Sequence, residues 1–318
     1  MMNNRFSILN RLGQLLGLLG VVACFGVLRP ETFLTAGNAE VMLTQTAVVG
    51  AAAIGMTFII VSGGIDLSVG SAIALVTVVL ARLLAAGLPP LPSAVLAVGA
   101  GALCGLLIGA LVAGLRLAPF IVTLGAWGAY RGLAKGLARE QTVLAPTTWL
   151  NGLLQSVDPA HRFQILPWGV WLTLLLAACM TVALGWTRFG RHVVALGSNE
   201  RTARLCGVPV SRVKVLIYLV AGIFTGVAGV LQFAYLSVGD PTTANGLELQ
   251  IIAAVVIGGA SLAGGQGSIP GTLIGAAIMT AVSNGCTKLG LANWIQEIVT
   301  GAIILLAVIA DRLRDRRL

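Results

Sequence analysis

The residues of this sequence that are most able to take part in binding or catalysis lie in glycine-rich interruptions of long apolar runs. One interruption separates the apolar runs Val41–Ile60 and Ala72–Leu80 and contains Asp66 and Ser68, and another spans Ile257–Gly265. A break in a membrane helix leaves backbone N–H and C=O groups unpaired, at several kcal/mol each, unless protein or water satisfies them. Such breaks are expected where the backbone lines a cavity or packs tightly against a neighbour. Paired breaks point toward a transport pathway.

Both interruptions supply candidate residues for that pathway. We expect their glycines to serve close backbone packing and turns more than direct solute contact. Asp66 is predicted to cap the following helix, with a place along the pathway as the alternative. The candidates are Gly63, Gly64, Asp66, Ser68, Gly70, Gly258, Gly259, Ser261, Gly264 and Gly265. The interruptions resemble each other weakly, which fits a remnant of an internal repeat, although coincidence is a rival in a chain with 41 glycines.

Ionisable residues are scarce inside the apolar runs, and this scarcity limits the chemistry. Ion-coupled carriers usually keep such groups in the membrane interior. Here Asp66 and Glu248 lie at interruptions, and the interior offers mainly amides and hydroxyls, including Gln45, Gln232 and Gln250. These groups can hydrogen-bond a neutral solute but do not readily carry a proton. The energy for uphill transport is therefore expected from a separate source.

Several other side chains have a functional and a plain interpretation that the sequence leaves open. Aromatic residues could stack on a sugar, or could serve packing and the membrane interface; they are Trp127, Tyr130, Phe233 and Tyr235. Basic residues at the outer end of the fifth apolar segment could contact an acidic partner or anchor the interface; they are Arg131, Lys135 and Arg139.

Composition sets the fold class. The chain is 57% hydrophobic and 10% charged, whereas soluble domains carry about 25% charged residues. We predict a single all-α, polytopic membrane domain over residues 1–318. The net charge of +9 does not indicate nucleic-acid binding, because basic residues gather in the loop 187–214 and at the C-terminus, as in proteins oriented by cytoplasmic basic loops.

About ten membrane-spanning segments are predicted, with both termini cytoplasmic and the eighth segment short enough to be re-entrant. The first is expected to be an uncleaved helix rather than a secretory or lipoprotein signal. The predicted segments are Leu12–Leu28, Val41–Val61, Val69–Gly87, Ser93–Leu115, Leu117–Lys135, Ile165–Trp186, Val215–Val238, Leu249–Ala263, Pro270–Thr287 and Trp294–Ala310.

Metal, disulfide and hydrolytic chemistry find little support. The cysteines form no C-x-x-C pair, and there are only two histidines. Buried cysteines usually behave as small hydrophobes. A serine nucleophile at Ser68 or Ser71 would need His161, which falls in a distant external segment. We therefore predict a protein without a catalytic site and without a cofactor of its own.

The basic loop 187–214 contains a predicted short capped helix. Asn199 is a suitable N-cap, Glu200 favours the positive N-terminal end, Gly207 suits a left-handed stop and Pro209 prevents continuation. Isolated helices below ~12 residues are marginal in water. This helix must therefore dock on something, either lipid headgroups or a cytoplasmic motor subunit.

Four stretches carry a resemblance to a known family. They are Gly55 to Ser71; Pro119 to Gly125 with Arg131-Gly132; Thr187 to Pro209; and Glu248 to Gly275 with Val256-Ile257-Gly258-Gly259-Ala260-Ser261-Leu262. In this order the chain resembles the permease subunit of ATP-binding-cassette (ABC) importers for simple sugars, the family of ribose, arabinose, galactose and xylose permeases. Ala260, where a threonine is commoner, and Ala126-Trp127-Gly128 depart from the pattern and leave the solute open.

The resemblance implies a bacterial inner-membrane complex. A second permease subunit (identical or a paralogue), a cytoplasmic ATP-binding subunit that holds ATP and magnesium, and a periplasmic sugar-binding protein would be its partners. This chain contains no phosphate-binding loop of its own. The implied ATPase-coupling residues are Gly190, Arg191, Gly197, Asn199, Glu200, Ala203 and Gly207.

Two alternatives stay open at this point. The interrupted helices also fit an ion-coupled secondary transporter. The same ABC machinery could instead carry a nucleoside, a sugar-derived signal or a branched-chain amino acid, because specificity in such systems rests largely on the separate binding protein.

Overall fold

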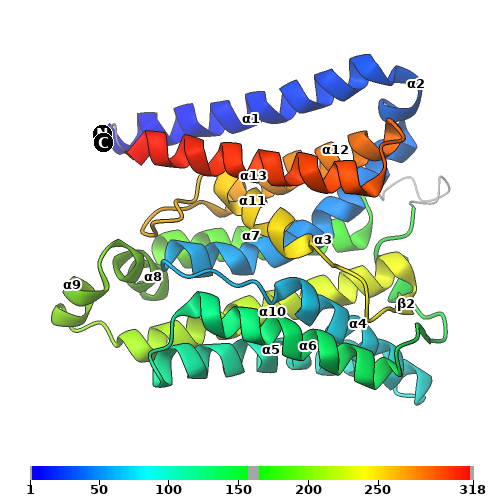
Figure 1. The fold of residues 1–318 in the computed structure, drawn as a ribbon, viewed down its shortest axis with the longest axis horizontal. Helices are drawn as coiled ribbons and strands as arrows, with labels where there is room; N and C mark the ends of the chain where they lie inside the picture. The colour runs from blue at the N-terminus through cyan, green and yellow to red at the C-terminus, as the bar shows by residue number, and fades with distance from the viewer. Residues whose placement is uncertain (1, 157–164, 316–318) are drawn as a thin grey trace.

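The computed structural model describes residues 2–156 and 165–315, which form a bundle of long helices (Figure 1). His161, considered above, lies outside the described residues. The long helices are α1 (Met2–Leu28), α3 (Ala36–Val61), α4 (Val69–Ala85), α5 (Pro90–Gly114), α6 (Pro119–Ala138), α7 (Trp168–Trp186), α10 (Val210–Leu236), α12 (Ile269–Lys288) and α13 (Asn293–Asp315). The shorter elements are α2 (Pro30–Phe33), β1 (Val143–Leu144), the 3-10 turn η1 (Asn151–Leu153), α8 (Arg188–Ser198), α9 (Glu200–Leu205), β2 (Val238–Gly239) and α11 (Leu247–Ile257).

The helical composition confirms the predicted all-α membrane fold. By length and hydropathy, α3, α5, α7, α10 and α12 are each able to cross a membrane, and shorter apolar helices cover 13–28, α4, α11 and 293–309. The remaining long helix, α6, carries Arg131 and Lys135. Together these helices account for the ten predicted segments.

The two ends of the bundle differ. One end carries α8 and α9, with the basic residues of the 187–214 loop, and α1 begins and α13 ends there too (Figure 1). We call this the basic end. At the opposite end β1 pairs antiparallel with β2. The predicted cytoplasmic location of both termini requires that they share a side, and this arrangement meets that requirement.

The helix α3 forms the centre of the bundle. All of its residues from Ala47 to Val61 are buried. Thr35 caps its start by accepting a hydrogen bond from the Asn38 N–H. Helices α5 and α10 pack almost backbone to backbone, because a Cβ added at Gly101 or Gly105 would overlap the backbone of Gly226 or Gly222. Small residues allow such close approach of membrane helices.

Two helices are too short to cross a membrane alone. Helices α4 and α11 have 17 and 11 residues, or about 25 and 16 Å at 1.5 Å per residue, against a hydrocarbon core of about 30 Å. Each is preceded by a non-helical segment, 62–68 and 240–246 respectively. Both helices begin in the interior of the bundle, α4 running toward the opposite end and α11 toward the basic end (Figure 1).

Several predicted boundaries were wrong. The eighth segment, predicted as Leu249–Ala263, ends at Ile257, because Gly259 takes the left-handed conformation (φ +86°) that stops α11. The seventh begins at Val210 rather than Val215, so the basic loop is shorter than expected. That loop contains two helices, α8 and α9, where one was predicted; Thr187 caps α8 by accepting from the Gly190 N–H.

Candidate translocation site and coupling region

The N-terminal ends of α4 and α11 meet inside the bundle. A Cβ added at Gly70, in the first turn of α4, would overlap Glu248 Oε2 and the Ala244 carbonyl oxygen. Glycine is therefore required at position 70 by this contact, and the first turn of α11 lies directly against it. The interruption at 62–68 and the segment 240–246 thus lead to one meeting point from opposite ends of the bundle.

Buried charges surround this meeting point. Asp66 is 6% exposed and Glu248 8% exposed. Asp66 Oδ1 accepts hydrogen bonds from the Ser68 N–H and hydroxyl, both at 2.7 Å. Asp66 thus orders the turn that leads into α4, whose N-cap position is Ser68, rather than capping the N–H groups of the helix itself as predicted. Glu248 Oε2 has no hydrogen-bond partner among the described residues. Its carboxylate instead faces the N-terminal end of α4, where a negative charge is stabilised by the helix dipole.

Arg131 supplies the compensating positive charge. Its guanidinium lies near enough to interact with the charges of Glu248 and Asp240. A helix N-terminus acts as about +0.5 of an elementary charge, so Arg131 and the N-terminal end of α4 both favour the Glu248 carboxylate. This arrangement explains how that carboxylate is tolerated inside a membrane protein.

The expected roles of Arg131 as an external contact or an interfacial anchor were wrong. Its Nη1 donates to the carbonyl oxygens of Pro241 and Thr243, at 2.9 and 2.7 Å. Helix α6 continues for two turns beyond Arg131, to Ala138, which places this arginine inside the bundle. Irregular backbone at membrane depth is tolerated only where protein or a cavity satisfies it, and Arg131 does so for 240–246.

A polar cavity of about 180 Å³ lies beside the meeting point. Its lining combines amides and hydroxyls with a few apolar side chains and contains no acidic or basic residue: Gln45, Val48, Val49, Gln232, Tyr235, Leu247, Gln250, Thr280 and Ser283. The Gln45 amide donates to the Tyr235 hydroxyl at 3.2 Å, and the Gln232 amide donates to the Thr243 hydroxyl at 2.9 Å. The cavity therefore suits a small, uncharged, hydrogen-bonding solute.

Of the four aromatic candidates, only Tyr235 lines this cavity. Phe233 is fully buried in the core, and the Tyr130 hydroxyl donates to the Cys104 carbonyl oxygen at 2.8 Å. Trp127 is 36% exposed on the side of α6. Packing thus accounts for Phe233 and Tyr130, as the plainer interpretation predicted.

Three glycine-bearing segments meet at the basic end. The Gly265 N–H donates to the Val61 carbonyl oxygen at 2.8 Å. A Cβ added at Gly197 would overlap that same carbonyl oxygen and lie 2.6 Å from the Gly265 nitrogen, and one at Gly264 would lie 2.8 Å from the Gly197 oxygen. We call Val61, Gly197, Gly264 and Gly265 the glycine junction. It joins the end of α8 to both glycine-rich interruptions.

Comparisons with known proteins agree with this architecture. The family model described as the permease component of branched-chain amino acid transport systems matches residues 38–308. The chain belongs to this permease family. No solved structure matches it.

Among curated relatives, the permease is 38% identical over 303 residues to the ribose import permease protein RbsC of Escherichia coli K12, covering 94% of this chain and 92% of that protein. It is 34% identical to the L-arabinose ABC transporter permease protein AraH of Azospirillum brasilense, covering 97% and 89%. The fructose import permease protein FrcC of Rhizobium meliloti is 35% identical, with 91% and 81% covered. The permease is accordingly a multi-pass ABC permease of the bacterial inner membrane.

Helix α9 of the permease has the caps predicted from sequence. Asn199 Oδ1 accepts from the Thr202 N–H at 2.9 Å, and Gly207 takes a left-handed φ of +81°. Glu200 pairs with Arg204 and Lys214 at 3.1 and 2.8 Å. The hydrogen bond from Lys214, reinforced by the charges of Lys214 and Arg204, holds the pKa of Glu200 below its ordinary value. Ala203, expected to face a partner, is 4% exposed and packs inward.

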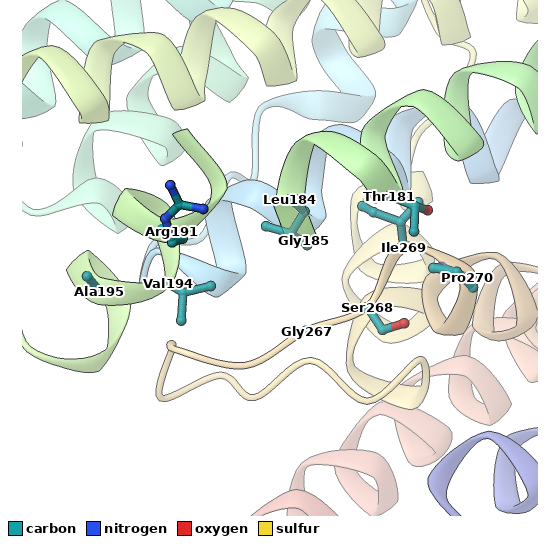
Figure 2. Close-up of a pocket in the computed structure, with 10 residues that line it drawn as sticks. All are labelled: Thr181, Leu184, Gly185, Arg191, Val194, Ala195, Gly267, Ser268, Ile269 and Pro270. Atoms are coloured by element: carbon teal, nitrogen blue, oxygen red, sulfur yellow. The ribbon is translucent and has the colours of Figure 1, made fainter. Parts of the chain in front are cut away.

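Helix α8 is anchored by glycines at both ends and by the buried side chains Val193 and Leu196 between them. At the start, Gly190 packs on the Leu184 carbonyl oxygen, where no side chain fits, and at the far end Gly197 enters the glycine junction. Between them a cavity of about 550 Å³ separates α8 from α7 and the start of α12. Figure 2 shows Arg191 and Val194 on one side of this space and Ser268 on the other. Arg191 is exposed and its Nη1 lies 3.4 Å from the Trp186 carbonyl oxygen.

The remaining predicted residues serve helix packing. Gly64 lies against the Tyr218 hydroxyl and Gly258 against the Thr272 backbone. Ser261 and the Leu262 N–H bind Asp311 Oδ2 of α13 at 3.3 and 3.2 Å. Sequence reasoning left 240–246 between two predicted spans and gave it no role. Pro241 and Gly246 mark it as non-helical, and Asp240 lies at its start much as Asp66 lies shortly before α4.

Proposed function

We propose that the permease provides the membrane path of an importer for a neutral simple sugar, driven by ATP hydrolysis on a partner subunit that docks at α8 and α9. The observation that carries the proposal is the uncharged polar cavity beside the meeting point of α4 and α11. Curated relatives named for ribose, arabinose and fructose support a sugar as solute.

The size of the cavity supports a closed state. At about 180 Å³ it holds the volume of about six water molecules, below the roughly 300–1,000 Å³ of pockets that enclose drug-sized ligands. Passage of a sugar therefore requires the cavity to widen. Segment 240–246 is tied to the cavity through Gln232, which lines the cavity and bonds Thr243, and we propose that movement of this segment opens the path outward.

A reconstituted uptake assay tests the solute. Vesicles containing the permease, its ATPase and its binding protein are expected to accumulate a labelled pentose or hexose with ATP, and not leucine. Replacing Gln250 by alanine should slow uptake about tenfold, since it removes a hydrogen bond to the solute. Gln155→Ala, exposed outside the cavity, is the control. Accumulation of leucine, or uptake of sugar that needs only an ion gradient, would overturn the proposal.

A binding assay tests the docking site. Leu205, at the end of α9, is 88% exposed, and an apolar side chain in that position suits a protein contact. Leu205→Asp should abolish co-purification of the ATPase, whereas Leu144→Asp, 76% exposed at the opposite end, should not. Equal retention of the ATPase by both variants would exclude α9 as the docking helix.

A further inference from the structure

A second, larger groove lies on the outside of the bundle at the basic end. It has a volume of about 780 Å³ and runs between the last turn of α5 and the first turns of α10. Its lining consists of small and apolar residues with a polar mouth: Ala110, Ala113, Gly114, Arg116, Ser211, Arg212, Val215, Leu216 and Leu219. No part of the sugar path described above uses this groove.

The groove follows from the residues of α5. Glycines hold α5 and α10 together as far as Gly109, whose added Cβ would lie 3.0 Å from the Val215 Cα. Beyond Gly109, α5 presents Ala110, Ala113 and Gly114 to this side, and a Cβ at Gly114 would meet nothing within 4 Å. The protein therefore leaves space open where a larger residue would fill it.

Two arginines stand at the mouth of the groove without a counter-charge. Arg116 and Arg212 are both exposed, and neither makes a hydrogen bond or ion pair within residues 2–156 and 165–315. The nearby acid, Glu200, is already bound by Arg204 and Lys214. Arg116 has a left-handed backbone (φ +55°), a conformation common just after the end of a helix, and it turns the chain away from α5.

The depth of the groove limits what fills it. From Arg212 to Leu219 the wall descends seven residues along α10, about 10 Å at 1.5 Å per residue, on a face that spans the membrane. A cytoplasmic protein loop inserted there would leave its backbone groups unpaired. A helix of a second permease would cover two guanidinium groups with apolar surface, which is costly.

A phospholipid satisfies both parts of the groove. We infer that it binds an anionic phospholipid, with the phosphate between Arg116 and Arg212 and an acyl chain along Ala110, Val215 and Leu219. Guanidinium groups bind phosphate oxygens through charge-assisted hydrogen bonds. Basic pockets between membrane helices on the cytoplasmic side are a known form of lipid recognition.

The bound lipid would also act on α9. Arg116 lines an adjoining cavity of about 180 Å³ together with Glu200, Arg204 and Lys214. A phosphate on Arg116 would therefore lie beside the Glu200–Lys214 ion pair that joins α9 to α10. This consequence rests on the proposed docking role of α9, whereas lipid binding itself does not.

Lipid retention by the purified, full-length permease tests the inference. Native mass spectrometry after exchange into mixed micelles of phosphatidylglycerol and phosphatidylcholine should show retained phosphatidylglycerol. Arg116→Gln/Arg212→Gln should weaken retention roughly 30-fold, because each of the two arginines contributes about fivefold, the typical effect of a basic residue near a membrane surface. Arg188→Gln/Arg201→Gln removes the same charge at the same end outside the groove and should retain the lipid.

Further arms separate lipid from other occupants. Arg116→Lys/Arg212→Lys, which keeps the charge, should keep most of the binding, and melting curves of all variants report whether each is folded. Equal loss in the control double variant would overturn the inference. Displacement of the lipid by millimolar inorganic phosphate would also overturn it. So would an Arg116→Gln/Arg212→Gln variant that retains lipid as the wild type does in mixed micelles but fails to bind the ATPase in a separate lipid-free assay, because the groove would then be a protein contact. If the permease proves not to transport sugar, the lipid-retention measurement still tests the inference.

Discussion

The two irregular segments that lead into α4 and α11 begin alike and are held differently. Asp66 accepts from the N–H and hydroxyl of Ser68, and Asp240 accepts from the N–H and hydroxyl of Thr242. Segment 62–68 is then held mostly by local bonds, with one long bond, 3.3 Å, from Thr123 of α6 to the Ile65 carbonyl oxygen. Segment 240–246 instead depends on Arg131 and Gln232, which belong to other helices.

This difference separates a fixed segment from a releasable one. Local hydrogen bonds persist when neighbouring helices move, because donor and acceptor travel together. Bonds from α6 and α10 break as soon as those helices shift relative to α11. The segment 240–246 is thus the one suited to open the cavity, and 62–68 is suited to anchor α4.

The largest effect is expected from Arg131→Gln. This change removes two charge-assisted hydrogen bonds to 240–246 and leaves Glu248 without its compensating charge, at a cost of roughly 3 kcal/mol. Thermal melting in detergent and sugar uptake should both fall sharply. Lys135→Gln, one turn further along α6, is the matched control. A wild-type melting curve for Arg131→Gln would contradict the dependence of 240–246 on α6.

Gly70→Ala is expected to come next, because it disturbs the point where both segments end. The new methyl group would collide with Glu248 and with the Ala244 carbonyl oxygen. Overpacking of this kind costs about 2 kcal/mol. Gly128→Ala, where nothing lies within 4 Å of the added Cβ, should be neutral or stabilising in the same melting assay. Equal tolerance of both changes would show that α4 and α11 do not meet closely.

Asp66→Ala should have a smaller effect, about 1 kcal/mol, because it removes the hydrogen bonds of one local turn. Asp66→Asn keeps an acceptor oxygen and should cost less still. Chemical denaturation of these two variants and of Arg131→Gln ranks their free energies of unfolding. If Asp66→Ala lowered the free energy of unfolding as much as Arg131→Gln does, the distinction between a locally held segment and one held by its neighbours would be lost.

The smallest effect on stability is expected at Glu200 of α9, whose exposed ion pairs can be compared with the buried charges near Arg131. The pKa of Glu200 is lowered in the folded protein, so its ion pairs contribute above its unfolded pKa of about 4.3 and are lost as the pH falls through the folded value. Glu200→Gln should cost about 0.5 kcal/mol at pH 7, and this cost should shrink as the pH falls below about 4.3. Melting temperatures relative to wild type, measured over a series of falling pH values, check this, with Glu140→Gln as the control.

The sequence by itself determined the membrane class, the ten segments and the caps of α9. Each of these depends on local composition, hydropathy or residues a few positions apart, which a chain carries wherever it folds. The glycines were correctly expected to serve packing, since close backbone approach needs them whichever neighbour is involved.

Only the tertiary structure decided which distant segments those residues serve. Arg131 and Glu248 lie 117 positions apart in the sequence, and nothing near either one indicates that they share a buried site with the start of α4. The same holds for Gly197, whose role depends on Val61 and Gly265. The physical reason is that burial of a charge or a close backbone contact is settled by the partner across the interface, and the partner is chosen by how whole helices pack.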